Sequence, residues 1–310
     1  MNSLFFALVQ ALVLFALAPL LSGVSRMARA RLHNRKGPGV LQEYRDLIKL
    51  LGRQSIAPTA SGWLFRLMPF LMIGVMLTIA TALPVVTIAS PLPAVGDLIT
   101  LIYLFAIGRF FFAVAGLDTG SPFTGIGASR EAMFGVLVEP ILLLSLWVVA
   151  QLAGSTHISL ITAAIYHWPV EQSIPLVLAF CACAFATFIE MAKLPFDLAE
   201  AEQELQEGPL SEYSGASFAL LKWGISLKQL VILQLFVGVF IPWGQIEHMS
   251  IAGLLLALVV ALIKLLAGIL VIALLENSMA RLRFLATSQV TWFGFGFAFL
   301  AFVSLLAIGF

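Results

Sequence analysis

The chain has 310 residues, of which 61% are hydrophobic and only 11% are charged, and its formal net charge is +1. Soluble domains carry roughly 25% charged residues, and a globule of this size could not hide so much apolar surface from water. Lipid must therefore be the solvent for most side chains. The near-zero net charge also gives no basic field of the kind that attracts nucleic acid.

Apolar runs long enough to cross ~30 Å of hydrocarbon at 1.5 Å per residue number about eight. In chain order they cover residues 4–24, 67–88, 98–117, 132–153, 174–194, 227–245, 251–275 and 291–309. The first run lacks the basic flank and cleavage site of a signal peptide, so we interpret it as a span. The sequence predicts an all-α, polytopic protein that forms a single membrane domain over residues 1–310.

Basic residues are distributed unevenly between the connecting loops. Residues 89–97, 154–173 and 242–250 contain no Lys or Arg, whereas residues 25–66 contain nine. By the positive-inside rule the basic loops face the cytoplasm, and an even number of spans puts both termini on the other side. We therefore predict a multi-pass protein of the bacterial inner membrane with both termini in the periplasm.

The first basic loop contains a regular element of its own. A G-P-G turn at residues 37–39 precedes residues 40–51, in which apolar residues recur at helical spacing between polar ones. This pattern predicts an amphipathic helix that lies on the membrane surface or under a partner.

Several ionisable side chains fall within the predicted spans, namely Arg109, Glu139, Glu190, Lys193 and Lys264. Each costs at least ~2.5–3.5 kcal/mol on insertion scales, so each requires a physical reason. All but Lys264 lie in the cytoplasmic half, which suggests a polar inlet that opens inward. Pro140 removes a backbone hydrogen bond directly after Glu139 and so would make room for water there.

Structural pairing is the alternative interpretation of these charges. Glu190 and Lys193 are three residues apart and could form a local ion pair. The side chains of Arg109 and Lys193 could extend to the nearby interface. Lys264 could serve only to neutralise a glutamate.

Acidic residues gather in the second long cytoplasmic segment, at residues 196–213. Asp197 as N-cap, Glu200 at the third helical position and a stop at Gly208 predict one short helix. That helix would align Asp197, Glu200, Glu204 and Glu207 on one stripe and put Glu202 on another face. Crowded carboxylates repel, so some should titrate nearer neutrality, as a proton relay requires. The same acids could instead meet a basic partner surface.

Metal and nucleophile chemistry are not indicated. The two cysteines, Cys181 and Cys183, lie in one apolar run, whereas an iron–sulfur cluster usually takes four thiolates. The four histidines are scattered along the chain. We predict no metal site and interpret both cysteines as packing residues.

Three motifs carry a resemblance to a known family. They are Glu190 with K-L-P-F-D-L-A-E-A-E-Q-E-L at residues 193–205 and E-Y-S at 212–214, Arg130 with Glu139, and R-x-G-P at 35–38 with L-Q at 41–42, Asp46 and K-L-L at 49–51. Together they resemble the complex I membrane subunit beside the peripheral arm, subunit 1 of the NADH dehydrogenase family, which is shared with membrane-bound hydrogenases. The short G-P-G turn, L-D-T-G-S-P-F at 117–123 and G-A-S-R-E at 127–131 are similar to the hydrogenase branch, that of formate hydrogenlyase and hydrogenase-4.

The resemblance implies a complex I subunit 1-like fold and a membrane anchor and coupling subunit of a hydrogen-evolving, formate hydrogenlyase-type complex. Residues 25–66 and 195–226 would dock the soluble arm: the large and small nickel–iron hydrogenase subunits, an iron–sulfur subunit and, through them, formate dehydrogenase. The other flank would meet an antiporter-like subunit, and the basic loop could hold phospholipid. No cofactor is expected on this chain, because the nickel–iron centre and the iron–sulfur clusters would belong to the partners.

Two sets of residues follow as candidates, and none of them is expected to be catalytic. The docking candidates are Arg31, Arg35, Lys36, Gly37, Pro38, Gly39, Asp46, Lys49, Glu207, Glu212 and Tyr213. The proton-path candidates are Arg109, Glu139, Glu190, Lys193, Asp197, Glu200, Glu202, Glu204 and Lys264. The alternatives are a free-standing ion transporter, which should contain repeats and a midplane site, and a quinone-linked subunit.

Overall fold

The computed structural model describes residues 3–167, 173–246 and 250–308, with the side chains of Glu202, Gln203, Ile251 and Leu285 left out. In this part of the chain, eight helices are long and apolar enough to cross a membrane. They are α1 (Ser3–Leu32), α3 (Trp63–Ala82), α4 (Leu98–Leu117), α5 (Pro122–Ala153), α7 (Ser173–Glu190), α9 (Gly215–Phe240), α10 (Ile251–Ser278) and α11 (Thr287–Ile308). The predicted all-α, multi-pass membrane fold is confirmed.

The remaining elements are short. They are α2 (Gln42–Leu51), α6 (Ile158–Tyr166), α8 (Glu202–Leu205) and the 3₁₀ turns at Gly208–Leu210 and Phe284–Ala286. Helix α2 is the amphipathic helix that the sequence predicts, and it buries Leu47 while it exposes Ile48. Helix α6 is not predicted by the hydropathy pattern; it buries Ile158, Ile161 and Ile165 under the ends of its neighbours.

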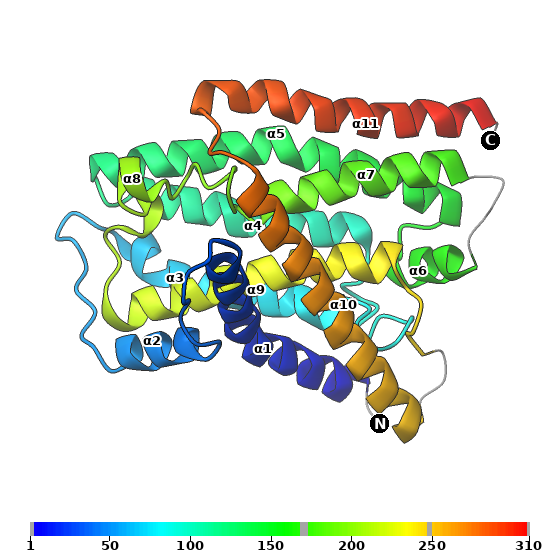
Figure 1. Ribbon diagram of the computed structural model, residues 1–310, viewed down its shortest axis with the longest axis horizontal. Coiled ribbons are helices and arrows are strands. Elements are labelled where there is room, and N and C mark those ends of the chain that lie inside the picture. The colour runs from blue at the N-terminus through cyan, green and yellow to red at the C-terminus, as the bar shows by residue number, and fades with distance from the viewer. Residues whose placement is uncertain (1–2, 168–172, 247–249, 309–310) are drawn as a thin grey trace.

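The long helices pack as a bundle with one outlying member (Figure 1). Helices α3, α4, α5, α7 and α9 pack on one another, and α11 covers α5 and α7. Fully buried side chains such as Met68, Leu101 and Leu146 fill the interior. Helix α10 packs mainly against α1 and only lightly against α9, and it crosses the bundle obliquely.

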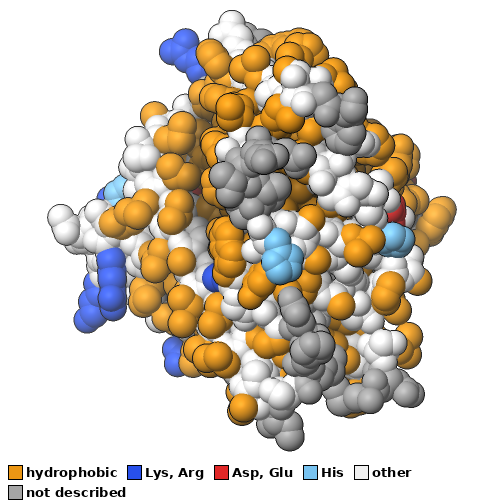
Figure 2. Space-filling view, turned by 90° about the vertical axis from the view of Figure 1, so that its right-hand side faces the viewer, with side chains coloured by type: hydrophobic (Ala, Val, Ile, Leu, Met, Phe, Trp, Pro, Cys, Tyr) orange, Lys and Arg blue, Asp and Glu red, His pale blue; other side chains and the backbone are white. Residues whose placement is uncertain are grey.

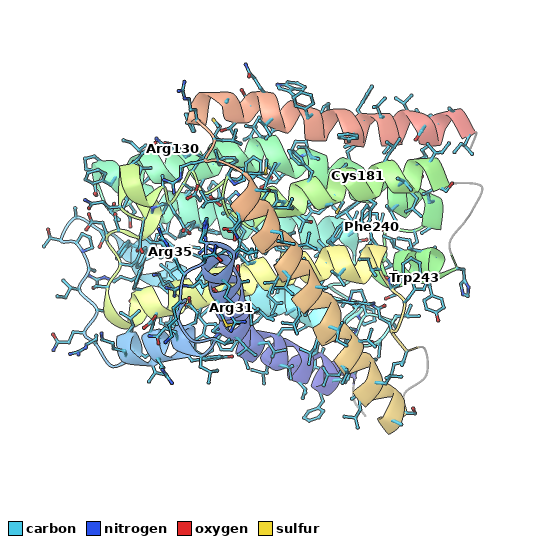
Figure 3. All side chains as sticks on the ribbon, viewed as in Figure 1. Arg31, Arg35, Arg130, Cys181, Phe240 and Trp243 are labelled. Carbon is cyan, nitrogen blue, oxygen red and sulfur yellow. The ribbon has the colours of Figure 1, made fainter. Side chains whose placement is uncertain are left out.

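The two ends of the bundle differ in charge. Helices α2 and α8 lie at one end and α6 at the other (Figure 1), and Arg31, Arg35 and Arg130 all lie toward the first end, far from Trp243 (Figure 3). We call the end formed by residues 25–66 and 195–226 the basic end. The opposite end exposes mostly hydrophobic side chains, with Lys and Arg largely near its margins (Figure 2). Helix α1 begins and α11 ends at this opposite end.

The two long segments of the basic end are joined to each other. The hydroxyl of Ser214 donates to the carbonyl of Ile56 at 3.0 Å and accepts from its N–H at 2.8 Å. The hydroxyl of Tyr213 donates to the carbonyl of Phe65 at 2.9 Å, and the two rings stack with centroids 3.9 Å apart. Gly215 has a φ of +54°, and a Cβ there would lie 2.2 Å from the carbonyl oxygen of Gln54. The segments therefore form one continuous surface.

The predicted helix of the acidic segment is wrong in length and in its cap. Helix α8 has only four residues, and the residue before it is Ala201, with a φ of +30°. Asp197 is no N-cap, because its carboxylate accepts from Arg281 at 2.5 Å. The single stripe of acids is therefore absent, since tertiary partners of this segment outweigh its local helix signals.

The acidic segment is held against the start of α5 by close contact between glycines. A Cβ at Gly127 would lie 2.6 Å from Cδ of Pro209, 2.8 Å from the carbonyl oxygen of Ala199 and 2.9 Å from Cα of Gly208. Only a residue without a side chain lets the segment approach this closely.

We predict that Gly127→Ala lowers the stability of the folded protein by about 1–3 kcal/mol, the usual cost of overpacking. Gly125→Ala is the matched control, because it lies two residues away on α5 and a Cβ there meets nothing within 4 Å. Thermal unfolding of the two variants, purified in detergent, checks this. Equal melting temperatures would contradict the close approach at Gly127.

Candidate functional site

Arg109 of α4 is the centre of a buried charge cluster. Its side chain is only 7% exposed, and the guanidinium faces three carboxylates. Its Nε lies 3.4 Å from Glu131, its Nη1 lies 3.3 Å from Glu139, and its Nη2 donates to Glu190. The fixed fork of donors in a guanidinium suits this arrangement, since each nitrogen points in a different direction.

A second cation completes the cluster. Nζ of Lys228, on α9, lies 3.5 Å from Glu131 and 3.5 Å from Glu190. Four helices therefore meet through ion pairs, because Glu131 and Glu139 belong to α5 and Glu190 ends α7. With all five groups ionised, three carboxylates face two cations. The cluster then carries one excess negative charge, which a proton can neutralise.

The sequence of α5 makes room for this arrangement. Glu131, Gly135 and Glu139 are spaced by four residues and so lie near one another on one side of the helix. A Cβ at Gly135 would lie 2.8 Å from Cδ of Arg109 and 3.0 Å from its Nη1. The guanidinium can sit between the two glutamates only because position 135 has no side chain.

The three carboxylate side chains of the cluster differ in how far they are exposed. The side chain of Glu139 is 33% exposed, against 10% for Glu131 and 3% for Glu190. Glu190 contacts both cations, whereas Glu139 contacts only Arg109. Glu139 is therefore the group that can gain or lose a proton with the least disturbance to the buried ion pairs. Helix α5 continues through Pro140 without interruption.

Two of the structural explanations that the sequence offered for the charged residues in the spans are wrong. Glu190 and Lys193 form no local ion pair, because α7 ends at Glu190 and Lys193 donates to the hydroxyl of Ser25 at 2.8 Å. Arg109 does not extend to the interface, since it is buried. The sequence reasoning missed Glu131 and Lys228 as cluster members. For Glu131, its spacing of eight residues from Glu139 was the available signal.

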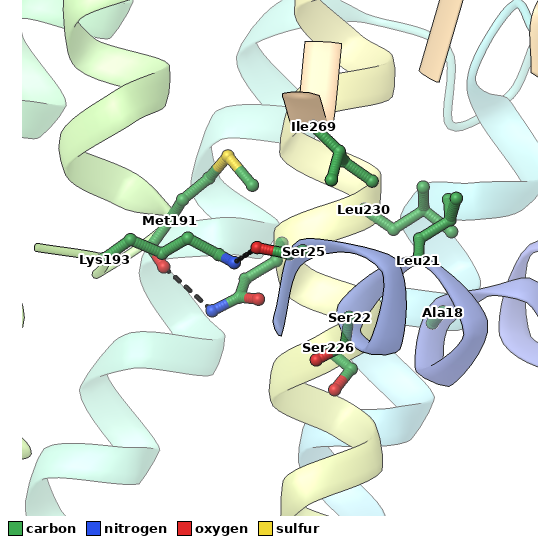
Figure 4. Close-up of a pocket in the computed structure, with 10 residues that line it drawn as sticks. Ala18, Leu21, Ser22, Ser25, Met191, Lys193, Ser226, Leu230 and Ile269 are labelled. Carbon is green, nitrogen blue, oxygen red and sulfur yellow. Dashed lines mark hydrogen bonds between the residues drawn. The ribbon is translucent and has the colours of Figure 1, made fainter. Parts of the chain in front are cut away.

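A small cavity lies between α1, α9, α10 and the segment after α7 (Figure 4). Its volume is about 20 Å³, and half of its lining residues are polar, namely Ser22, Ser25, Lys193, Ser226 and Gln229. The amide of Gln229 donates to the carbonyl of Met191 at 2.9 Å. The volume and lining suit a single buried water. The cavity adjoins the charge cluster along the chain, since Gln229 follows Lys228 on α9 and Met191 follows Glu190.

The sequence analysis also did not single out a buried carboxylate near this cavity. Glu276, close to the end of α10, is buried and lies 3.6 Å from Nε of Arg29. The hydropathy of the seventh span gave no signal for it, because the predicted run ends at residue 275.

The acids of residues 196–213 are mostly paired within the chain rather than stacked in a row. Asp197 pairs with Arg281, Glu204 lies 2.9 Å from Arg130, and Glu207 lies 3.5 Å from Lys222. Arg130 also donates to the carbonyl of Leu198 and lies over the ring of Phe284. The side chain of Glu202 lies outside the described residues.

Glu200 differs from these acids because its environment favours the protonated form. Burial, reinforced by the carboxylates of Glu131 and Glu207 and opposed by Lys222, raises the pKa of Glu200 to about 7. The influence of Glu131 connects this residue electrostatically to the charge cluster. A carboxyl with this pKa can change its protonation state near neutral pH.

Lys264 takes no part in the cluster. It lies on α10 and donates to the carbonyl oxygen of Ile241, the residue that caps α9, at 2.5 Å. The alternative that Lys264 neutralises a glutamate is wrong, because none of its contacts in the described structure is a carboxylate.

The docking candidates all lie within the two segments of the basic end, and all but Tyr213 are at least partly exposed. The exposed ones are Arg31, Arg35, Lys36, Pro38, Gly39 and Lys49, and the partly exposed ones are Gly37, Asp46, Glu207 and Glu212. Tyr213 is buried and joins the two segments instead of facing outward. Within the described ranges, no three His, Cys, Asp or Glu side chains gather in a way that could hold a metal ion.

Comparisons with known proteins identify the family. The model of the family described as NADH dehydrogenase matches residues 5–308. The chain belongs to this family. A relative from Escherichia coli K12, formate hydrogenlyase subunit 4, is 77% identical over 305 residues, which cover 98% of this chain and 99% of the relative. Hydrogenase-4 component C of the same organism is 56% identical over 299 residues, 96% of this chain and 94% of that protein.

A solved structure supports the fold independently. A chain of the archaeal membrane-bound sulfane sulfur reductase, a respiratory membrane complex, matches with a TM-score of 0.85. The match covers 98% of this chain and all of the other at 23% identity. The predicted membership in the hydrogenase branch of the NADH dehydrogenase family is confirmed by the two Escherichia coli relatives.

We predict a pH-dependent effect of Glu200→Gln on stability. The folded state keeps its proton on Glu200 up to about pH 7, whereas the unfolded chain releases it near the ordinary value of 4.5. Ionisable Glu200 therefore lowers the stability of the wild-type protein progressively as the pH rises through this window. The permanently neutral Gln should raise the melting temperature at pH 8 more than at pH 5.

Glu204→Gln is the matched control in the same segment. It removes an exposed carboxylate that pairs with Arg130, so it should raise the melting temperature at neither pH. Equal gains for Glu200→Gln at pH 5 and pH 8 would show that repulsion and burial do not act on this carboxyl.

Proposed function

We propose that this chain is the membrane anchor and coupling subunit of a hydrogen-evolving complex of the formate hydrogenlyase type. The observation that carries the proposal is the largely buried cluster of five charged residues beneath the continuous surface of the basic end. The 77% identity to formate hydrogenlyase subunit 4 over nearly the whole chain supports the type of complex. The catalytic metals, a nickel–iron centre and iron–sulfur clusters, belong to partner subunits in this proposal.

The basic end docks the soluble arm in this proposal. Its exposed cations, including Arg31, Arg35, Lys36 and Lys49, offer a positive surface to the large and small hydrogenase subunits and their iron–sulfur subunit. Formate dehydrogenase joins through that arm, and an antiporter-like subunit adjoins another flank of the bundle. By the positive-inside rule the basic end faces the cytoplasm of the bacterial inner membrane, and both termini face the periplasm.

The charge cluster exchanges protons with the docked arm in this proposal. Glu200 gains and releases a proton near neutral pH and acts on Glu131, which shares Arg109 and Lys228 with the other two cluster carboxylates. Glu139 takes up the proton that neutralises the excess charge. The partner combines two protons with two electrons to form H2, so a proton supply under the docking surface serves that chemistry.

We predict that Glu139→Gln lowers formate-dependent H2 production at least about tenfold while the complex stays assembled, since an amide cannot exchange a proton. Glu139→Asp, which keeps a titratable carboxyl, should recover part of the rate. H2 production from an artificial electron donor by the soluble arm should be unchanged in both variants. Wild-type formate-dependent rates in Glu139→Gln would leave the cluster with a structural role only.

We predict that Arg35→Glu combined with Lys36→Glu releases the hydrogenase from membranes, because it reverses two exposed charges of the docking surface. The swap Arg35→Lys with Lys36→Arg keeps the charge and is the control. Hydrogenase activity in washed membranes gives the readout. Isolation of the intact wild-type chain without any hydrogenase subunit would favour a free-standing transporter and contradict the proposed function.

A further inference from the structure

An open apolar cleft separates α10 from α7 and α9. It has a volume of about 480 Å³, and its walls are almost entirely hydrocarbon, with Phe180 and Phe188 from α7, Phe236 from α9, and Val271 and Leu275 from α10. The cleft is accessible from outside, since Phe180, Val271 and Leu275 are all more than one third exposed. Helix α10 packs mainly on α1 and takes an oblique course across the bundle (Figure 1).

One cation lies at one end of the cleft. Lys264 lines it together with Ile241, where α9 ends toward the end of the bundle opposite the basic end. From Lys264 the lining continues along α10 to Leu275, which is ~16 Å of helix at 1.5 Å per residue. The cleft therefore has a charged end away from the basic end and an apolar remainder that runs inward.

Only part of the hydrogen-bonding capacity of the Lys264 ammonium is satisfied by the protein. It donates one hydrogen bond, to the carbonyl oxygen of Ile241, whereas an ammonium has three donors. No Asp or Glu in the described ranges lies within ion-pair distance of it. A cation in an apolar setting without a counter-charge is costly, so an anion that reaches this point would be bound favourably.

We propose that this cleft is a binding site for an anionic phospholipid of the leaflet opposite the basic end. Its phosphate contacts Lys264, and one acyl chain lies inward along Phe236 and Val271. The arrangement of one cation at the outer end and hydrocarbon below it matches the arrangement of polarity in such a lipid. A membrane helix from a partner fits these features less well, because nothing in the cleft other than Lys264 would recognise it.

The inner part of the cleft lies close to the charge cluster along α7, which suggests what a bound lipid does. Thr187 also lines the cleft, and it lies on α7 three residues before Glu190 of the charge cluster. An acyl chain there excludes water from the side of the bundle that faces lipid. The bound lipid therefore insulates the cluster on this side and leaves the basic end as its route to water.

A photoreactive lipid tests this site in the purified membrane complex. The probes are phosphatidylglycerol and phosphatidylcholine, each with a diazirine in one acyl chain. Phosphatidylglycerol should label α7 and α10 at the cleft, and Lys264→Met should weaken that labelling roughly fivefold, as expected for about 1 kcal/mol per cation near lipid phosphate. Lys264→Arg should restore it, and phosphatidylcholine should be insensitive to both changes.

A steric pair of variants keeps the test independent of Lys264. Val271→Trp fills the cleft and should abolish labelling there. Ile263→Trp is the matched control, because Ile263 is similarly exposed on α10 (60% against 55%) but does not line the cleft. Equal cleft labelling in wild type, Lys264→Met and Val271→Trp would overturn the proposal. Attachment of a photoprobe placed at Phe180 to a partner polypeptide rather than to lipid would overturn it as well.

Discussion

The ion pairs between Arg109 and three carboxylates fix the positions of the four central helices. A guanidinium and a carboxylate are expensive to remove from water, and inside a membrane that cost is recovered only when every charge meets its partners in good geometry. Arg109 and Glu190 are both buried here, and they join α4 to α7 while Glu131, Glu139 and Lys228 add α5 and α9. Each helix must therefore hold its depth and rotation, because a shift of one turn would leave a buried charge alone.

The requirement for close approach explains where glycine occurs around this cluster. Gly135 admits the guanidinium between two glutamates of α5, and Gly127 admits the acidic segment against the same helix two turns earlier. The two contacts lie on one helix, so the position of the acidic segment and the position of Arg109 are set by a single rigid element. This arrangement connects Glu200 to the cluster without a long flexible connection, and it supports the proposed exchange of protons beneath a docked partner.

Helix α10 is positioned by different interactions from those that hold the central helices. It carries Glu276 near its end at the basic end and Lys264 at its midpoint, and its other side chains are largely apolar and only partly covered by protein. With no ion pair to hold its middle against α7, packing on α1 determines its course. The open space that results is lined by Thr187, three residues before the buried Glu190, so the proposed lipid would lie close to the charge cluster.

The sequence by itself determined the number of membrane helices, the uneven distribution of basic residues and the family, because length, hydropathy and motifs are local properties. The α4 span, Leu98–Leu117, agrees with the predicted run at both ends. Arg109, Glu139 and Glu190 were rightly singled out as ionisable side chains within the spans, and of these Arg109 and Glu190 are buried and Glu139 is half-buried. Hydropathy missed the polar extensions of α1, α5 and α9, since these leave the hydrocarbon. Only the tertiary structure decided which charges meet. Lys193 pairs with Ser25, Lys264 with a helix end, and Asp197 with Arg281, because partners in a membrane bundle come from helices far apart in the sequence.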